Sequence, residues 1–243
     1  MHLSARDLVD VWEWGWDRSA VDRPLYLLLR ALPEGTWSDL AALSIGRRNR
    51  YLLEIRERQL GARLDCRVTC PACASELEFA LDCRAFEEHP AVDEGAVHVL
   101  HDGDIEVRFR ELDSQDLALA AEKLDVGQAR QALIRRSLLE ARRDRKVLRA
   151  EDLPESTITR LSDELERLDR AVAWRLSLDC ENCGHEWSAH LDVADYLWSE
   201  VWARARHVLN EVHELACAYG WSEAEVLGMS DVRRRAYLEL VRG

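Results

Sequence analysis

Two short cysteine pairs, far apart in the sequence, constrain the fold of this chain more than any other feature. One is a C-x-x-C motif at Cys70 and Cys73, and the other is a C-x-x-C motif at Cys180 and Cys183. Their neighbourhoods match beyond the cysteines, as CPACASELEFALD and CENCGHEWSAHLD. Apolar residues alternate before and after each pair, which indicates two units of strand, turn and strand. We call each such cysteine turn a knuckle.

The two knuckles together predict a metal site. A C-x-x-C turn between strands directs both sulfurs to one point, so two knuckles supply the four thiolates of a closed structural zinc site. The predicted ligands are Cys70, Cys73, Cys180 and Cys183, and the predicted cofactor is one structural Zn²⁺ per chain. Because four thiolates leave no open coordination position for water, such an ion would stabilise the fold and would not hydrolyse a substrate.

Several alternatives to this zinc site stay open. A thioredoxin-type redox pair needs a helix directly after the motif, whereas ELEFAL after the first knuckle alternates like a strand. The cysteines could also bind no metal, or His185 could replace one of the thiolates. Iron accepts four thiolates as zinc does, although zinc is the commoner ion in such sites.

Composition places the chain among ordinary globular proteins. It has 243 residues, of which 47% are hydrophobic and 33% charged, enough for a substantial core in one or two domains. No apolar run reaches membrane-spanning length, and the N-terminal MHLSARDLVD does not resemble a signal peptide. We therefore expect the protein to stay in the cytoplasm unless it leaves as part of an assembly. Seven cysteines in such a chain indicate metal binding or buried thiols, not a disulfide framework.

Hydrophobic periodicity predicts a mostly helical α+β fold built around a split zinc ribbon. The expected parts are a helical arm over residues 1–61, a split ribbon over 62–83 and 172–192, an inserted lobe over 84–171 and a second helical arm over 193–243. Within the lobe the pattern predicts one β-hairpin around residues 97–109 and three helices, of which the second would run from about 127 to 142. The basic stretch RRDRKVLR at 142–149 is interpreted as an exposed turn.

The two helical arms carry similar sequences. The pattern S-x-x-R-R-x-x-Y-L begins at Ser44 and again at Ser230, and it is preceded by WSD at 37–39 in the first arm and by WSE at 221–223 in the second. The two copies differ by two residues in spacing. If they are related, the arms can serve as similar docking surfaces on either side of the ribbon.

Large aromatic residues and arginines supply the candidates for contacts with partners, since such side chains often anchor interfaces. These candidates are Trp14, Trp16, Trp37, Trp198, Trp221, Arg47, Arg48, Arg233 and Arg234. The tryptophan cluster at 12–16 is more typical of core packing, and the arginines are more typical of a solvated helix face with local ion pairs.

No catalytic constellation accompanies these features. The chain has no Gly-rich phosphate loop, no H-E-x-x-H and no serine nucleophile elbow, so we expect neither an enzyme nor a small-molecule substrate. A net charge of −13 weighs against nucleic acid as a partner. The alternative function is nevertheless a zinc-ribbon nucleic-acid-binding regulator, which would need a basic face around Arg47, Arg48, Arg233 and Arg234.

Both ends of the chain resemble a known family. SIGRRNRYLLEIR at 44–56 leading into the first knuckle, and C-x-x-C-G-H-x-W at 180–187 with EVHELACAYGWSEAE at 211–225, are similar to the baseplate hub assembly chaperones of T-even-type contractile phage tails. Related proteins occur in phage-like contractile injection systems. The resemblance implies a non-enzymatic protein that helps to assemble, or becomes part of, the baseplate, hub or cap region of a contractile tail-like particle. Its implied partners are the subunits of that region.

Overall fold

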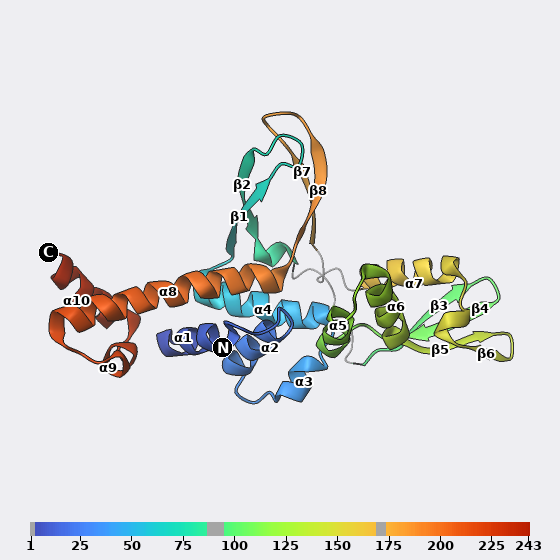
Figure 1. The fold of residues 1–243 in the computed structure, drawn as a ribbon, viewed down its shortest axis with the longest axis horizontal. Coiled ribbons are helices and arrows are strands. Elements are labelled where there is room, and N and C mark those ends of the chain that lie inside the picture. Colours follow the sequence, from blue (N-terminus) through green and yellow to red (C-terminus); the bar gives the residue numbers. More distant parts are fainter. Residues whose placement is uncertain (1–2, 87–94, 169–173) are drawn as a thin grey trace. The chain divides into compact units, whose positions relative to one another are not determined.

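The structure is a computed structural model that describes residues 3–86, 95–168 and 174–243 (Figure 1). The chain divides into two compact units. We call the unit formed by Met1–Gly35 and Ala194–Gly243 the terminal unit, because it joins the two ends of the chain. Thr36–Val193 form the central unit, which contains both knuckles.

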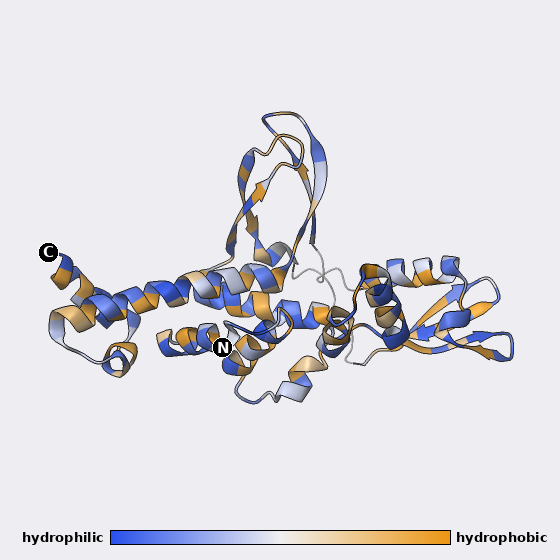
Figure 2. Ribbon diagram, in the orientation of Figure 1, coloured by the Kyte–Doolittle hydropathy of each residue, from blue (hydrophilic) through white to orange (hydrophobic). Residues whose placement is uncertain are grey.

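The regular elements of the terminal unit are all helices in its described residues. Its helices are α1 (Ala5–Gly15), α2 (Asp22–Ala31), α8 (Val193–Tyr219, whose first residue belongs to the central unit), α9 (Glu223–Leu227) and α10 (Asp231–Arg242). Figure 2 shows apolar and polar residues interspersed along α8, as expected for a helix that buries one face. The end of α8 packs with α1, α9 and α10 around a core of Ala5, Val9, Val208, Val212, Leu215, Val226, Leu227 and Leu238.

The central unit begins with two helices and then forms the ribbon. The helices are α3 (Trp37–Ala41) and α4 (Ile45–Leu60). The ribbon consists of two antiparallel hairpins, β1 (Arg63–Thr69) with β2 (Glu76–Asp82) and β7 (Trp174–Asp179) with β8 (Glu186–Leu191). A short 3-10 helix, Cys83–Phe86, follows β2. Each hairpin places one knuckle at its turn, as the alternation of apolar residues predicts.

The inserted lobe lies between the two hairpins in sequence. It contains β3 (His98–Asp102), β4 (Ile105–Phe109), α5 (Ser114–Ala121), α6 (Val126–Ser137), β5 (Leu138–Arg143), β6 (Lys146–Leu148), a 3-10 helix at Ala150–Asp152, and α7 (Glu155–Leu168). The four strands form one antiparallel sheet in the order β3-β4-β5-β6. Residues from one face of this sheet and from α6 and α7 form the lobe core, which includes Val107, Phe109, Ile134, Ala141 and Leu161.

The second half of the lobe departs from the sequence prediction. The helix expected to reach residue 142 ends at Ser137, and Leu138–Arg143 form β5 instead. The stretch 142–149 does contain an exposed turn, at residues 144–145, but strand residues of β5 and β6 flank it. The physical reason is tertiary: β5 completes the sheet beside β4, and Ala141 then becomes buried with 1% exposure. The lobe therefore contains four strands in addition to its three helices, where one hairpin was predicted. Residues 87–94 and 169–173, at the edges of the lobe, lie outside the described residues.

This architecture confirms the prediction of a mostly helical α+β fold. The second helical arm begins with the long helix α8, and Gly220, with φ of 70°, follows the end of that helix, where a left-handed backbone favours glycine. No helix in the described residues is long and apolar enough to cross a membrane.

Candidate metal centre

The two knuckles have the same backbone hydrogen bonds. In the first, the Cys70 amide donates to the Ser75 carbonyl at 2.9 Å and the Ala74 amide donates to the Cys70 carbonyl at 2.9 Å. In the second, the Cys180 amide donates to the His185 carbonyl at 3.0 Å and the Gly184 amide donates to the Cys180 carbonyl at 2.7 Å. The fourth residue after each first cysteine has a left-handed backbone, with φ of 60° at Ala74 and 69° at Gly184.

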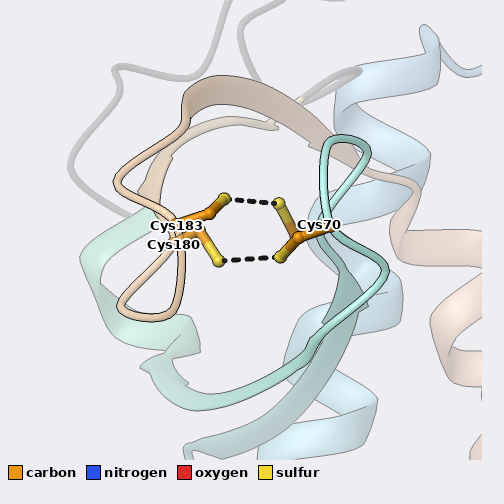
Figure 3. Close-up of side chains that lie close together, drawn as sticks. Cys70, Cys180 and Cys183 are labelled. Carbon is orange, nitrogen blue, oxygen red and sulfur yellow. Dashed lines mark hydrogen bonds between the residues drawn. The ribbon is translucent and has the colours of Figure 1, made fainter.

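These matched turns bring the four sulfurs together (Figure 3). All four Sγ atoms lie within 4.8 Å of one another. The Sγ atoms of Cys70 and Cys183 are 3.8 Å apart, and those of Cys73 and Cys180 are 3.6 Å apart. Each of these short distances joins one knuckle to the other. The structure therefore gathers the four cysteines that the sequence predicts as ligands at one point between the two hairpins.

The spacing of the sulfurs fits a tetrahedral metal ion. Zinc–thiolate bonds of about 2.3 Å would place the sulfurs at the corners of a tetrahedron with edges of about 3.8 Å. The two printed sulfur–sulfur distances, 3.8 and 3.6 Å, are close to that edge. The donors are four soft sulfur atoms, a set that suits zinc or iron better than calcium or magnesium. Among the described residues no histidine or carboxylate joins the cluster, and the His185 ring instead stacks on Trp187 at a centroid distance of 6.0 Å.

The ionisation of the thiols is strongly uneven. Hydrogen bonds between Cys73 and the side chain and backbone of Ser75, followed by one with the Asn182 side chain, lower the pKa of Cys73 to about 5. For Cys183, a hydrogen bond from the His185 amide lowers the pKa, but the Cys73 thiol, burial and the other two thiols raise it to about 12. Four neighbouring thiols cannot all carry negative charge because like charges repel. A bound divalent cation removes this restriction by stabilising all four thiolates.

Asn182 and Ser75 support the cluster and were not among the predicted site residues. The Asn182 side-chain nitrogen lies 3.6 Å from the Cys73 sulfur and 3.0 Å from the Ser75 hydroxyl oxygen, so it links the second knuckle to the first. Such contacts commonly orient metal ligands. Their positions inside or beside the C-x-x-C motifs are the only sequence signal that could have indicated them.

The structure separates the predicted partner-binding tryptophans by exposure. Trp16 is 61% exposed and Trp37 is 37% exposed. The other three are half-buried: Trp14 stacks on Tyr26 at 4.2 Å, Trp198 lies under the Arg23 guanidinium at 4.7 Å, and Trp221 stacks on Tyr219 at 4.4 Å. The interpretation of the first tryptophan cluster as packing is thus consistent with Trp14 but does not describe Trp16.

The four predicted arginines fall into two pairs. Arg47 lies over the Tyr51 ring at 5.9 Å, and Arg233 lies over the Tyr237 ring at 5.7 Å. Arg48 and Arg234 are both buried, with 4% exposure each. Arg48 donates to Asn49 and Ser114, and Arg234 donates to Glu211 and Asp231. Burial removes Arg48 and Arg234 from the surface that a partner or a nucleic acid could contact.

The fold and the cysteine cluster define a helical α+β protein with a four-cysteine site suited to holding a metal ion. Comparison with protein families matches residues 31–197, which include both knuckles and the whole lobe, to the family described as T4 bacteriophage base plate protein. The chain belongs to this family of T4-type phage baseplate proteins. Searches of the curated proteins and of the solved structures give no match.

Family membership confirms the resemblance to T-even phage baseplate proteins at the level of the baseplate family. It supports a structural or assembly role in a phage baseplate, and such a role implies contacts with other baseplate components.

Proposed function

We propose that this chain is a non-enzymatic structural or assembly protein of the baseplate, hub or cap region of a contractile phage tail or a related contractile injection system. It acts through protein–protein contacts and is stabilised by one Zn²⁺ per chain. It is made in the cytoplasm, where it either becomes part of the particle or assists assembly and is then released. The family match over residues 31–197 carries this proposal, because it spans the ribbon and the lobe together.

In this proposal the metal stabilises the fold by linking the two knuckles. Cys73 and Cys180 are 107 residues apart in sequence, so one ion that binds both knuckles closes a long loop. Closing a loop of this length by a covalent cross-link stabilises a folded chain by about 4 to 5 kcal/mol in the chain-entropy account. A metal link acts in the same direction, since it also restricts the unfolded chain. The ion would therefore link the two ends of the chain segment that contains the lobe.

The alternative function, a zinc-ribbon nucleic-acid-binding regulator, receives little support. Its basic face depends on four arginines, and two of them, Arg48 and Arg234, are buried. On the exposed face of ribbon strand β1, Arg67 pairs with Glu78 at 2.5 Å and Arg63 pairs with Asp65 at 2.7 Å, so acidic groups offset the positive charge of that face. With a net charge of −13, the chain as a whole repels phosphate.

The proposed function is tested in bacteria that produce the particle. Deletion of the gene is expected to leave tubes or sheaths without complete baseplates in electron micrographs of purified particles. Expression of the wild-type chain, or of a Cys217→Ser variant outside the cysteine cluster, is expected to restore complete particles, whereas Cys183→Ser is expected not to do so. Complete, contraction-competent particles in the deletion strain would refute the assembly role.

A further inference from the structure

The two knuckles are related by an approximate twofold exchange, which their sequences, turns and sulfur contacts all follow. Alignment of the two motifs pairs Cys70 with Cys180 and Cys73 with Cys183. The same exchange converts the 3.6 Å sulfur contact between Cys73 and Cys180 into the 3.8 Å contact between Cys183 and Cys70. The backbone hydrogen bonds of the two turns match in the same way. Side-chain contacts at equivalent positions can therefore be compared directly.

One side-chain contact crosses from the second knuckle to the first. The Asn182 side-chain nitrogen donates to the Ser75 hydroxyl at 3.0 Å and lies 3.6 Å from the Cys73 sulfur. The Ser75 hydroxyl oxygen lies 3.3 Å from the same sulfur. We call Asn182 and Ser75 the asparagine bridge. Because one of its residues belongs to each knuckle, the bridge holds Cys73 from both sides, as polar partners of metal ligands commonly do.

The described residues contain no equivalent bridge at Cys183. Its two positions are occupied by Ala72 and His185. An alanine methyl group cannot donate a hydrogen bond, and the imidazole stacks on Trp187 instead. Cys183 and Cys73 each have a backbone hydrogen bond with the residue two positions further on. The asparagine bridge is therefore what distinguishes the surroundings of these two equivalent sulfurs.

Burial distinguishes the four cysteines in the same direction. Cys70 and Cys180 are buried, Cys73 is half-buried, and Cys183 is exposed. A soluble reagent reaches an exposed ligand first, and no bridging side chain has to move before that ligand leaves a metal ion. Cys183 combines exposure with the lack of a bridge, so it is the least restrained of the four predicted ligands.

We propose that Cys183 is the exchangeable ligand of the metal site, the one that a soft donor from solution, such as a thiolate, replaces first. The asparagine bridge holds Cys73 in place during that exchange. Cys73 and Cys180 then keep the two knuckles joined, so the metal can enter and leave at one corner without separating the hairpins. This inference rests on the proposed zinc site and does not depend on the role in the baseplate.

Limited alkylation tests the order in which the cysteines become reactive. The full-length chain loaded with zinc is treated with a substoichiometric amount of N-ethylmaleimide, and the modified cysteines are located by tandem mass spectrometry. Cys183 is expected to react about tenfold faster than Cys73, the size of effect that contacts around metal ligands commonly have. Cys217, which is exposed and lies outside the cluster, is the internal reference for access of the reagent.

Removal of the bridge tests its positioning role. Asn182→Ala is expected to raise the reaction rate of Cys73 about tenfold, whereas Asn210→Ala, at an exposed position on α8, is expected to leave it unchanged. In the chain loaded with Co²⁺, Asn182→Ala should also shift the sulfur-to-cobalt absorption band to longer wavelength, because a thiolate that loses a hydrogen bond gives up its electrons more easily. General loosening of the fold would raise the reactivity of all four cysteines together.

Transfer of the bridge makes the test specific. Ala72→Asn combined with His185→Ser places the same two side chains beside Cys183 that the native chain places beside Cys73. This double variant is expected to slow the reaction of Cys183 about tenfold. Its metal content is measured on the same sample, so that protection by the bridge is distinguished from a change in metal loading.

Two results would overturn this inference and leave the zinc site in place: equal reaction rates of Cys183 and Cys73 in the zinc-loaded chain, or a zinc-loaded double variant in which Cys183 reacts as fast as in the wild type. A freshly reduced wild type without metal would overturn the zinc site and this inference together. The assembly role is tested separately by the deletion strain.

Discussion

Single buried residues set the local geometry of both units. In the central unit, Asp116 is the hub of an ion cluster: its carboxylate accepts hydrogen bonds from Arg110 at 2.7 and 3.0 Å and from Arg136 at 2.7 Å, and its side chain is 0% exposed. These contacts tie α5 to the end of β4 and to α6. In the terminal unit, Gly15 lies against the Trp198 ring, so that its lack of a side chain allows close packing of α1 on α8.

Asp116 should make stability depend on pH. Burial raises the pKa of Asp116, but the hydrogen bonds from Arg110 and Arg136 outweigh it and hold that pKa below its usual value. A carboxyl whose pKa is lowered on folding stabilises the protein above its unfolded-state pKa of about 3.9 and loses that contribution as the pH falls. Burial raises the pKa of neighbouring Asp113, which acts in the opposite direction.

Substitution tests this dependence. Asp116→Asn is expected to lower the free energy of unfolding by about 2 kcal/mol at pH 7, because it leaves charged donors with a weaker acceptor. The difference from the wild type should shrink as the pH falls toward 3, measured by urea denaturation. Asp163→Asn, at an exposed position on α7, serves as the control. A constant difference at all pH values would show that Asp116 acts by shape and not by charge.

Gly15 provides a second test at this scale. A Cβ atom on residue 15 would lie far inside van der Waals contact with the Trp198 ring. Gly15→Ala is therefore expected to lower stability by about 1 to 3 kcal/mol, as overpacking does. In a Trp198→Ala background the same change should cost little, because the clashing ring is gone. Equal costs of Gly15→Ala in both backgrounds, measured by thermal unfolding, would contradict this explanation.

At the scale of elements, the ribbon consists of two short hairpins that cannot be stable alone. Each has only two strands, and isolated two-stranded hairpins are marginal in water. The β1–β2 and β7–β8 strands also belong to separate sheets, so no backbone ladder joins them. At the knuckles, side chains link the two hairpins: the four cysteine sulfurs gather within 4.8 Å of one another, and the Asn182 side chain donates to the Ser75 hydroxyl.

The metal content of the purified protein tests whether the two knuckles share one zinc ion. We expect about one zinc per purified chain by elemental analysis, in accordance with the four-thiolate site. Cys70→Ser and Cys183→Ser, one from each knuckle, should both lose the metal and lower the unfolding temperature, whereas Cys217→Ser should change neither. Metal retained in either knuckle variant, or absent from the freshly reduced wild type, would show that the two knuckles do not share one zinc ion.

At the scale of the whole molecule, the lobe has a hydrophobic core of its own. That core joins the four-stranded sheet to α6 and α7, and it includes no residue from either knuckle. The lobe contacts the start of α4 through backbone pairing around residues 112–114. We infer that it folds as an insertion whose stability does not depend on the metal.

A fragment of residues 95–168 should therefore unfold cooperatively by circular dichroism, with the same midpoint with or without a chelator. In the full-length chain, a chelator should lower the ribbon transition and leave the lobe transition in place. The full-length chain with excess zinc is the control. A fragment without cooperative unfolding, or a lobe transition that shifts with the chelator, would refute its independence.

The sequence by itself determined the features that depend on local chemistry. Matched C-x-x-C motifs flanked by period-two alternation predict both hairpins and their turns, and a serine cap precedes each of α1, α9 and α10. The four clustered cysteines could be chosen from the sequence as candidate metal ligands for the same reason, since a knuckle fixes its two sulfurs locally. Motifs in 44–56 and 180–225 also indicated the baseplate family.

Tertiary structure alone decided the rest. Leu138–Arg143 lack a strong local preference, and they form β5 because β4 offers a partner and a buried position for Ala141. Arg48 and Arg234 resemble solvated helix charges in the sequence, yet Ser114 and Glu211, distant in the chain, provide their buried partners. Whether a helix start is covered, as in α4, or open, as in α10, likewise depends on segments far away in sequence. Local patterns cannot encode such long-range partners.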